Sequence, residues 1–369
     1  MVLGREQIMV AEPISLQNDS FPTETIQDEM IERIQSFPRI RYMGSKYKIV
    51  PYLTKIFLEL PGQKVLDAFI GSGIVSYALK VAGKSVHSND YMNFPVEIAK
   101  ATVVNSNITL SQSEISQLLE EQPNRDQFIL NTFHGLYFDD EDHAFLDNTW
   151  ANLRNLDNPY KQALVKSALC LAAIKKQPRG VFTITDSRYN DGRKDLRLSM
   201  KEQFLNALEG YQSIIFDNGQ VHSATNQDIF DCDTEFDVVY MDPPYMPKKD
   251  DNDYIKRYHF LEGLSVYWEN QRIMEQTKTK KLEKRPTRFG RRPTIHNTFD
   301  DLFRKFADST IVLSYSSNGI PSLEDMTKLL RKYKTSVELI KIPHRYSFGT
   351  HENVAEGSNL VDEYIFIGR

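Results

Sequence analysis

The chain of 369 residues carries a formal net charge of −5, with 40% hydrophobic and 26% charged side chains, a composition typical of folded, water-soluble proteins. The acidic balance excludes a uniformly basic protein that coats nucleic acid, and no apolar run approaches the roughly 18 residues that a membrane span requires. The N-terminal residues lack the basic start and apolar block of a signal peptide, so we expect a cytoplasmic protein without a membrane partner.

The first sheet-forming block follows a polar N-terminal extension, residues 1–37. Residues 62–90 contain an apolar run, a glycine-rich turn, a helical stretch and a second apolar run. This order predicts a strand, a helix and a parallel strand. Residues 38–110 therefore form the first part of an α/β domain.

Residues 111–216 have a different pattern. Their apolar positions recur at helical spacing without a strong buried strand between them, which predicts a helical insertion. Within it, alternation around Asp191 and Gly192 predicts a hairpin near 180–198. Cations cluster there, at Arg179, Arg188, Arg193, Lys194 and Arg197. Such an exposed arm is either a solvated turn or an element that reads a DNA groove.

Sheet patterns return between residues 217 and 369. We expect this block to join residues 38–110 in one doubly wound, Rossmann-like parallel sheet that carries the insertion. Its residues 278–292 hold eight Lys or Arg against the single acid Glu283. This basic segment is either a solvated loop or a surface for phosphates.

The sequence DAFIGSG, residues 67–73, ends a predicted strand in a glycine turn. Such turns bring the backbone close to a ligand at the carboxyl edge of a sheet. Ser76 stands where a dinucleotide-binding motif requires a third glycine, so the signal for NAD is weak. Asp90 ends the next strand, where an acid can accept hydrogen bonds from ribose hydroxyls. A ligand with a nucleoside but no required diphosphate fits this pattern, and S-adenosylmethionine is one such ligand.

A second polar motif, Asp242-Pro243-Pro244-Tyr245, follows a buried strand predicted at residues 236–240. The prolines stop the strand and stiffen the backbone after it. The Asp242 carboxylate and the Pro243 carbonyl can both accept hydrogen bonds from one amine, and Tyr245 can stack on a flat ring. Two acceptors make an exocyclic amine a better nucleophile toward a methylsulfonium, and proximity supplies much of the acceleration.

These motifs and their order resemble the D12-class (α-group) N6-adenine DNA methyltransferases. The resemblance rests on RYMGSK (41–46), DAFIGSG (67–73), Asp90, NQDIFD around Asp228, DPPY (242–245) and LSYSSNG from Leu313. It implies a Rossmann-like methyltransferase domain, S-adenosylmethionine as cofactor, double-stranded DNA as substrate, and a target adenine flipped out of the duplex. The insertion occupies the place of a target recognition domain.

The resemblance also assigns residues by position. Catalysis falls to Asp242, Pro243, Pro244 and Tyr245, and cofactor binding to Tyr42, Lys46, Asp67, Phe69, Gly71, Gly73, Asp90, Asp228 and Asp242. We expect DNA contacts from Arg179, Arg188, Arg193, Lys194, Arg197, Lys248, Lys280, Lys281, Arg291 and Arg292.

Several alternatives stay open. The same residues fit an amine methyltransferase acting on RNA or on cytosine N4, or a catalytically silent subunit that binds nucleic acid for a partner. The scattered histidines predict no metal site. The sequence does not decide between a monomer and a weak dimer, nor between independent action and pairing with a cognate restriction endonuclease.

Overall fold

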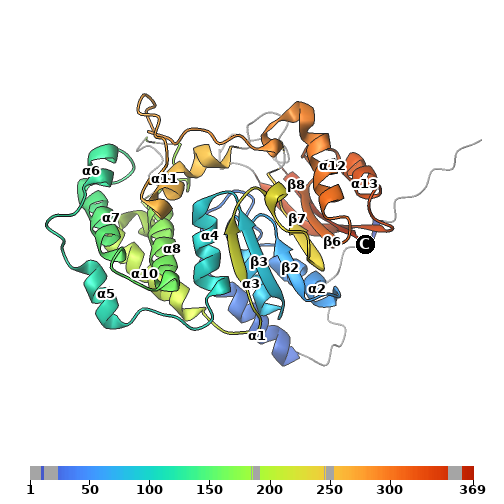
Figure 1. Ribbon diagram of the computed structural model, residues 1–369, viewed down its shortest axis with the longest axis horizontal. Helices are drawn as coiled ribbons and strands as arrows, with labels where there is room; N and C mark the ends of the chain where they lie inside the picture. Colours follow the sequence, from blue (N-terminus) through green and yellow to red (C-terminus); the bar gives the residue numbers. More distant parts are fainter. Residues whose placement is uncertain are drawn as a thin grey trace, which may run out of the picture.

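The computed structural model describes residues 10–11, 24–183, 185, 192–244, 246, 253–347 and 360–369. The two predicted sheet-forming blocks meet in one sheet (Figure 1). Its order is β1-β7-β8-β6-β5-β2-β3-β4. The strands are β1 (Val10–Ala11), β2 (Lys64–Asp67), β3 (Ser85–Asp90), β4 (Ser223–Asn226), β5 (Val238–Met241), β6 (Thr310–Ser316), β7 (Val337–Ser347) and β8 (Leu360–Gly368).

The strand order reverses between β2 and β5. From β4 to β6 all neighbouring strands are parallel, whereas β8 runs antiparallel between β6 and β7. The chain leaves β2 toward β3 on one side, while β5 lies on its other side, with Asp67 opposite Tyr240. In a doubly wound sheet such a reversal opens a crevice at the carboxyl ends of the strands. The fold therefore places the glycine turn and Asp242 at one edge.

Successive side chains of the central strands point to opposite faces of the sheet, and they are buried on both faces. Val238 and Tyr240 of β5 join one hydrophobic cluster, and Val239 and Met241 join the other. The helices of the sheet domain that contribute to the first cluster include α1 (Glu24–Gln35), α2 (Val50–Glu59), α3 (Ile74–Val81) and α4 (Asn93–Ala99). Helix α4 continues into the π-helix η1 (Lys100–Val104). The second cluster includes residues of α12 (Ile295–Lys305) and α13 (Leu323–Leu330). This is the predicted doubly wound arrangement.

The described residues of the insertion form six helices. These are α5 (Gln112–Leu119), α6 (Phe128–Phe133), α7 (Asp140–Leu153), α8 (Pro159–Lys175), α9 (Lys194–Arg197) and α10 (Met200–Ser213). Local sequence explains where two of them begin. Ser111 with Glu114, and Ser199 with Glu202, form capping boxes that satisfy backbone N–H groups at the starts of α5 and α10.

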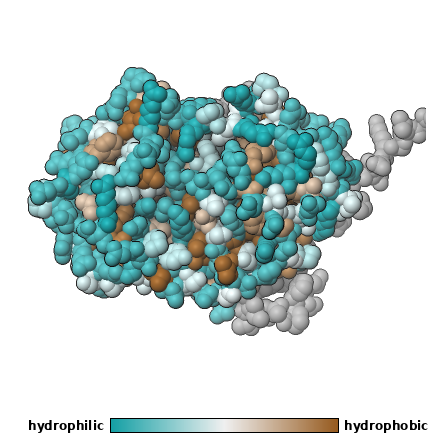
Figure 2. Space-filling view, in the orientation of Figure 1, coloured by the Kyte–Doolittle hydropathy of each residue, from teal (hydrophilic) through white to brown (hydrophobic). Residues whose placement is uncertain are grey.

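The insertion shares a continuous core with the sheet domain rather than forming a detached lobe. Helix α8 packs against α4 and against α11 (Tyr254–Val266). The buried indole Nε1 of Trp150 donates a hydrogen bond to the Leu264 carbonyl of α11, at 2.9 Å. Figure 1 shows these helices beside α4, at the β4 end of the sheet. The visible surface is mainly hydrophilic, with hydrophobic residues dispersed among polar ones (Figure 2).

Two sequence predictions need correction. The hairpin expected near 180–198 has no second strand, because Lys194–Arg197 is the short helix α9. Tertiary contacts hold the side chains of α9, among them an ion pair of 2.9 Å between Asp195 and Arg41. The alternation of apolar and polar residues in the sequence does not reveal such contacts. Residues 184 and 186–191, including the predicted turn at Asp191, lie outside the described residues. The N-terminal extension also adds a strand, since β1 pairs with β7.

The joint between insertion and sheet domain is testable through Trp150. In Trp150→Phe the Leu264 carbonyl loses this buried donor, which costs about 1–3 kcal/mol of unfolding free energy. We expect the variant to lower the midpoint of one transition shared by both parts, measured by thermal denaturation with circular dichroism. Val221→Ala, at a side chain that is 84% exposed, should leave the midpoint unchanged. Separate transitions for the two parts would contradict a shared core.

Candidate functional site

Two adjoining cavities lie at the carboxyl ends of β2, β3 and β5. The first, an open space of about 530 Å³, is lined among others by Tyr42, Lys46, Gly71, Asp90, Asp242 and Tyr254. The second, of about 340 Å³, is lined among others by Asn89, Gln227, Asp228, Ile229, Thr287 and Phe289. Phe69, Tyr91 and Pro244 line both. The cavities therefore form one elongated groove at the predicted edge.

The glycine turn is shaped for close approach. Gly71 has φ of +53° and Gly73 has φ of +84°, backbone conformations that favour glycine. A Cβ at Gly71 would lie 2.9 Å from the ring of Tyr42, and one at Gly73 would lie 2.8 Å from Ile98. The turn thus lets Tyr42 and Ile98 of α4 pack against it, while the backbone of Gly71 borders the first cavity.

Asp67 lies beneath the turn, outside the residues that line either cavity. Its carboxylate accepts hydrogen bonds from Ser76 Oγ at 2.5 Å and from the Phe69 backbone N–H at 3.4 Å. Burial raises its pKa to about 7. Ser76, which breaks the dinucleotide pattern, thus serves to anchor this acid. Asp67 supports the turn, and the structure gives it no direct exposure to the groove.

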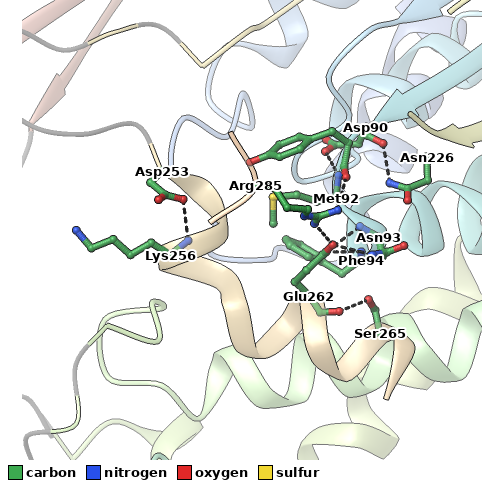
Figure 3. Close-up of polar contacts among 11 residues, drawn as sticks. Asp90, Met92, Asn93, Phe94, Asn226, Asp253, Lys256, Glu262, Ser265 and Arg285 are labelled. Atoms are coloured by element: carbon green, nitrogen blue, oxygen red, sulfur yellow. Dashed lines mark hydrogen bonds and ion pairs between the residues drawn. The ribbon is translucent and has the colours of Figure 1, made fainter. Parts of the chain in front are cut away.

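Asp90 borders the first cavity at the end of β3. Its carboxylate accepts hydrogen bonds from the backbone N–H groups of Gly71 at 3.0 Å and Met92 at 2.9 Å. Figure 3 shows Asp90 above the start of α4, where its backbone carbonyl accepts a hydrogen bond from the side-chain amide of Asn226. Burial raises the pKa of Asp90 to about 7. The Asp90 carboxylate therefore links the glycine turn to the turn between β3 and α4, residues 90–94, which is the second βα turn of the sheet.

Lys46 is buried between two carboxylates. Its Nζ lies 2.7 Å from Asp242 Oδ2 and 3.3 Å from Glu363 Oε1, and it donates a hydrogen bond to the Gly44 carbonyl. The Glu363 side chain, from β8, is 1% exposed, whereas that of Asp242 is 19% exposed at the cavity wall. Sequence reasoning missed Glu363, although an acid inside the apolar terminal strand is a signal that could have revealed it.

The pKa of Asp242 reflects these neighbours. Burial raises it to about 6, the positive charge of Lys46 opposes the rise, and the negative charge of Glu363 adds to it. Asp242 is therefore mainly ionised at neutral pH and able to accept hydrogen bonds, but it becomes protonated in mild acid. Pro243 is buried behind it and Pro244 borders both cavities.

An aromatic stack fixes the segment that carries Lys46. The Tyr42 ring lies 4.8 Å from that of Tyr258 at 13° and 5.4 Å from that of Tyr254 at 29°. The Met43 backbone N–H donates to Tyr258 Oη at 2.7 Å, and Tyr254 Oη donates to the Met43 carbonyl at 3.3 Å. Burial raises the pKa of Tyr42. Helix α11 therefore holds this segment against the groove.

Asp228 borders the second cavity. One carboxylate oxygen accepts the Phe230 backbone N–H at 3.0 Å, capping the short helix η3 (Ile229–Asp231). The other oxygen accepts no hydrogen bond from the described residues. Phe69 and Phe289 meet edge to face across this cavity, with centroids 5.5 Å apart. The second cavity thus combines apolar rings with one exposed carboxylate.

The cations expected to contact DNA are dispersed. Arg179, Lys194, Arg197, Arg291 and Arg292 are exposed, whereas Lys280 and Lys281 are half-buried, with Lys280 3.6 Å from Glu275. Arg193 is half-buried and donates to the carbonyls of Gln177 and Pro178, so it ties the N-cap of α9 to the turn that follows α8. Tyr245, Arg188 and Lys248 lie outside the described residues.

Two negative findings concern other classes of site. In the part of the chain that the structure describes, no helix is long and apolar enough to cross a membrane. The same residues contain no cluster of three or more His, Cys, Asp or Glu side chains arranged to hold a metal ion.

Comparison with known proteins identifies relatives. The chain is 26% identical over 345 residues to the type II methyltransferase M2.HphI of Haemophilus parahaemolyticus, covering 88% of this chain and 97% of that protein. It is 24% identical to modification methylase LlaI of Lactococcus lactis subsp. lactis and to modification methylase StsI of Streptococcus sanguinis, covering 89% of this chain in each case. It spans about half the length of these two, 54% and 52%.

A family model gives the assignment. Residues 42–329 match the D12 class N6 adenine-specific DNA methyltransferase model. The matched residues include the glycine turn, the insertion and the Asp242 motif. The match favours adenine in DNA over the RNA and cytosine alternatives, and the relatives are named as methyltransferases or methylases rather than as silent subunits. The chain belongs to the D12 class of N6 adenine-specific DNA methyltransferases, enzymes that transfer a methyl group to N6 of adenine in DNA.

Proposed function

We propose that the groove binds S-adenosylmethionine and that Asp242 and Pro243 receive the N6 amine of an adenine flipped out of a specific double-stranded DNA sequence. The observation that carries this proposal is the position of Asp242. Its carboxylate borders the first cavity beside the glycine turn, 2.7 Å from a buried lysine. An acceptor at this edge can meet an amine that enters beside a bound methyl donor.

The groove suits both ends of the donor. The backbone of Gly71 and Ser72 and the ring of Tyr42 would border the methionine part, and Asp90 the ribose. The rings of Phe69 and Phe289 offer apolar faces for the adenine part, and Asp228 has a carboxylate oxygen that can accept the exocyclic amine of that adenine. S-adenosylmethionine, when bound, supplies a methyl group on a positively charged sulfur.

The chemistry of the protein groups is orientation and hydrogen bonding. Asp242 and the Pro243 carbonyl accept the two amine protons, which favours the geometry in which the nitrogen lone pair is free to react. Their attraction strengthens as the nitrogen gains positive charge during the transfer, in which the N–CH3 bond forms as the S–CH3 bond breaks. S-adenosylhomocysteine is then the leaving group, and the surplus proton on the nitrogen passes to solvent. Lys46 holds the Asp242 carboxylate in place and keeps it ionised near neutral pH. Tyr245 comes next but one after Pro243 in the sequence, where it could stack on the flipped base.

The insertion is the proposed target recognition domain. It stands beside the sheet domain (Figure 1) and carries exposed cations at Arg179, Lys194 and Arg197. Phosphate contacts by such cations position a protein on DNA, whereas contacts with base edges select the sequence. The relatives are named as type II methyltransferase or modification methylases. On this basis we propose a role in restriction and modification, with a cognate endonuclease as the functional partner.

Loss of the Asp242 carboxylate tests the mechanism. In Asp242→Ala one of the two amine acceptors is absent, so we expect methyl transfer to DNA to fall by a factor on the order of 10²–10³ or more. Transfer of tritium from labelled S-adenosylmethionine to duplex DNA measures the rate. Asp308→Ala, at an exposed acid preceding β6, should leave the rate unchanged. Wild-type transfer by Asp242→Ala would contradict the proposed role.

The dependence on pH tests the charge environment of Asp242. Because protonated Asp242 loses an acceptor, kcat/KM should fall as the pH drops through about 6, the pKa to which burial raises this group. Glu363→Gln removes a neighbouring negative charge, so the pKa of Asp242 falls and the acid limb should move to lower pH. A pH–rate profile of both proteins checks this. An acid limb at the same pH in both would rule out the assignment.

Neutralising the proposed phosphate-binding cations should weaken DNA binding. For the double variants Lys280→Gln/Lys281→Gln and Arg291→Gln/Arg292→Gln, we expect a higher Kd for duplex DNA. The slope of log affinity against log salt should also flatten by about 0.9 for each phosphate that the variant no longer neutralises. Fluorescence anisotropy over a salt series measures both quantities. Lys328→Gln, an exposed cation of α13 paired with Glu324, is the control, and unchanged slopes in both double variants would make these residues mere surface cations.

A further inference from the structure

Arg285 belongs to the basic segment 278–292 but contacts the protein rather than solvent alone. Its Nη2 forms an ion pair with Glu262 Oε1 of α11, and its Nη1 donates to the Tyr91 carbonyl at 3.1 Å. The guanidinium also lies 5.5 Å from the centre of the Tyr91 ring. A guanidinium satisfied in this way is not available to phosphate without breaking these contacts.

Glu262 connects Arg285 to the second βα turn. Its side chain is fully buried. The carboxylate accepts the Asn93 backbone N–H and the Asn93 side-chain amide, each at 2.7 Å, and the Phe94 backbone N–H at 3.4 Å. Figure 3 shows Arg285 and the start of α4 both reaching the carboxylate of Glu262. One buried acid thus binds the start of α4 and the basic segment together.

The residues around this pair border the groove. Tyr91 lines both cavities, between Asp90 and the Met92 N–H that the Asp90 carboxylate binds. On the other side, Thr287 and Phe289 closely follow Arg285 in sequence and line the second cavity. The Arg288 guanidinium lies over the Phe230 ring, 3.9 Å from its centre. The basic segment therefore supplies one wall of the second cavity, and the turn 90–94 supplies another.

We propose that Arg285 and Glu262 are positioning residues for the nucleoside part of the methyl donor, because their ion pair joins the turn 90–94 to the segment 285–289 beside the second cavity. This inference rests on the proposed binding of S-adenosylmethionine in the groove. Neither Arg285 nor Glu262 lines either cavity, so the pair would act on the donor through Tyr91 and through the segment that carries Phe289. Its loss should thus weaken donor binding while leaving the Asp242 motif and its reaction intact.

The test compares two ion pairs at different places in the same stretch of chain. Arg285→Ala, Arg285→Lys and Glu262→Gln break the inner pair. Arg272→Ala and Glu283→Gln break an outer pair, whose atoms lie 3.4 Å apart and whose side chains are 80% and 54% exposed. Titration calorimetry with S-adenosylhomocysteine as the probe gives Kd, and steady-state kinetics give KM for S-adenosylmethionine and kcat.

We expect the inner-pair variants to raise the Kd for S-adenosylhomocysteine and the KM for S-adenosylmethionine by about tenfold or more. Their kcat at saturating donor should remain within about threefold of the wild type, and the outer-pair variants should match the wild type throughout. Arg285→Lys keeps the charge but lacks the planar fork needed to reach Glu262 and Tyr91 together. It therefore provides the readout if Arg285→Ala does not fold.

Two results for the Arg285 variants would overturn the proposal. A folded Arg285 variant with a lower melting temperature but wild-type Kd for S-adenosylhomocysteine would show a purely structural role. Weaker DNA affinity with a flatter salt dependence and unchanged Kd for S-adenosylhomocysteine would assign Arg285 to DNA. Failure of the wild type itself to bind S-adenosylhomocysteine would instead reject the proposed function, and with it this inference.

Discussion

The ion pair between Lys46 and Asp242 is the interaction on which the site depends. A lysine that is 2% exposed needs compensating charge, which Asp242 provides from just after β5 and Glu363 from β8. Burial raises the pKa of Asp242 to about 6 and the negative charge of Glu363 adds to the rise, while the positive charge of Lys46 opposes it, so the group is largely ionised at neutral pH. The carboxylate is thus held in place as an acceptor at the cavity wall.

The remaining architecture keeps that ion pair at the right edge of the sheet. The strand reversal between β2 and β5 brings the glycine turn and Asp242 together. The stack of Tyr42 on Tyr254 and Tyr258 ties the segment containing Lys46 to α11. Helix α11 also packs on the insertion through α8 and supplies Glu262 to the start of α4. One helix therefore contacts the proposed catalytic, cofactor-binding and DNA-reading parts.

Sequence patterns predicted the elements whose signals are local. The doubly wound sheet, the helical block and the glycine turn follow from periodicity and glycine placement, and the place of Asp242 at a strand end follows from its two prolines. Periodicity and glycine placement did not predict the side-chain contacts between segments that are separated in the sequence. Glu363 and the Glu262–Arg285 pair act through partners far away in sequence. Asp67 was expected at the cofactor but lies beneath the turn, because Ser76 binds it there.

The proposed site should methylate adenine N6 within one defined DNA sequence. Kinetic single-molecule sequencing of DNA from a host that expresses the protein, compared with the same host lacking it, is the most direct test. We expect polymerase pausing characteristic of N6-methyladenine at one fixed sequence context, present only in the expressing host. Modification at cytosine, or the absence of any modified adenine from DNA of a host producing folded protein, would contradict the proposed reaction.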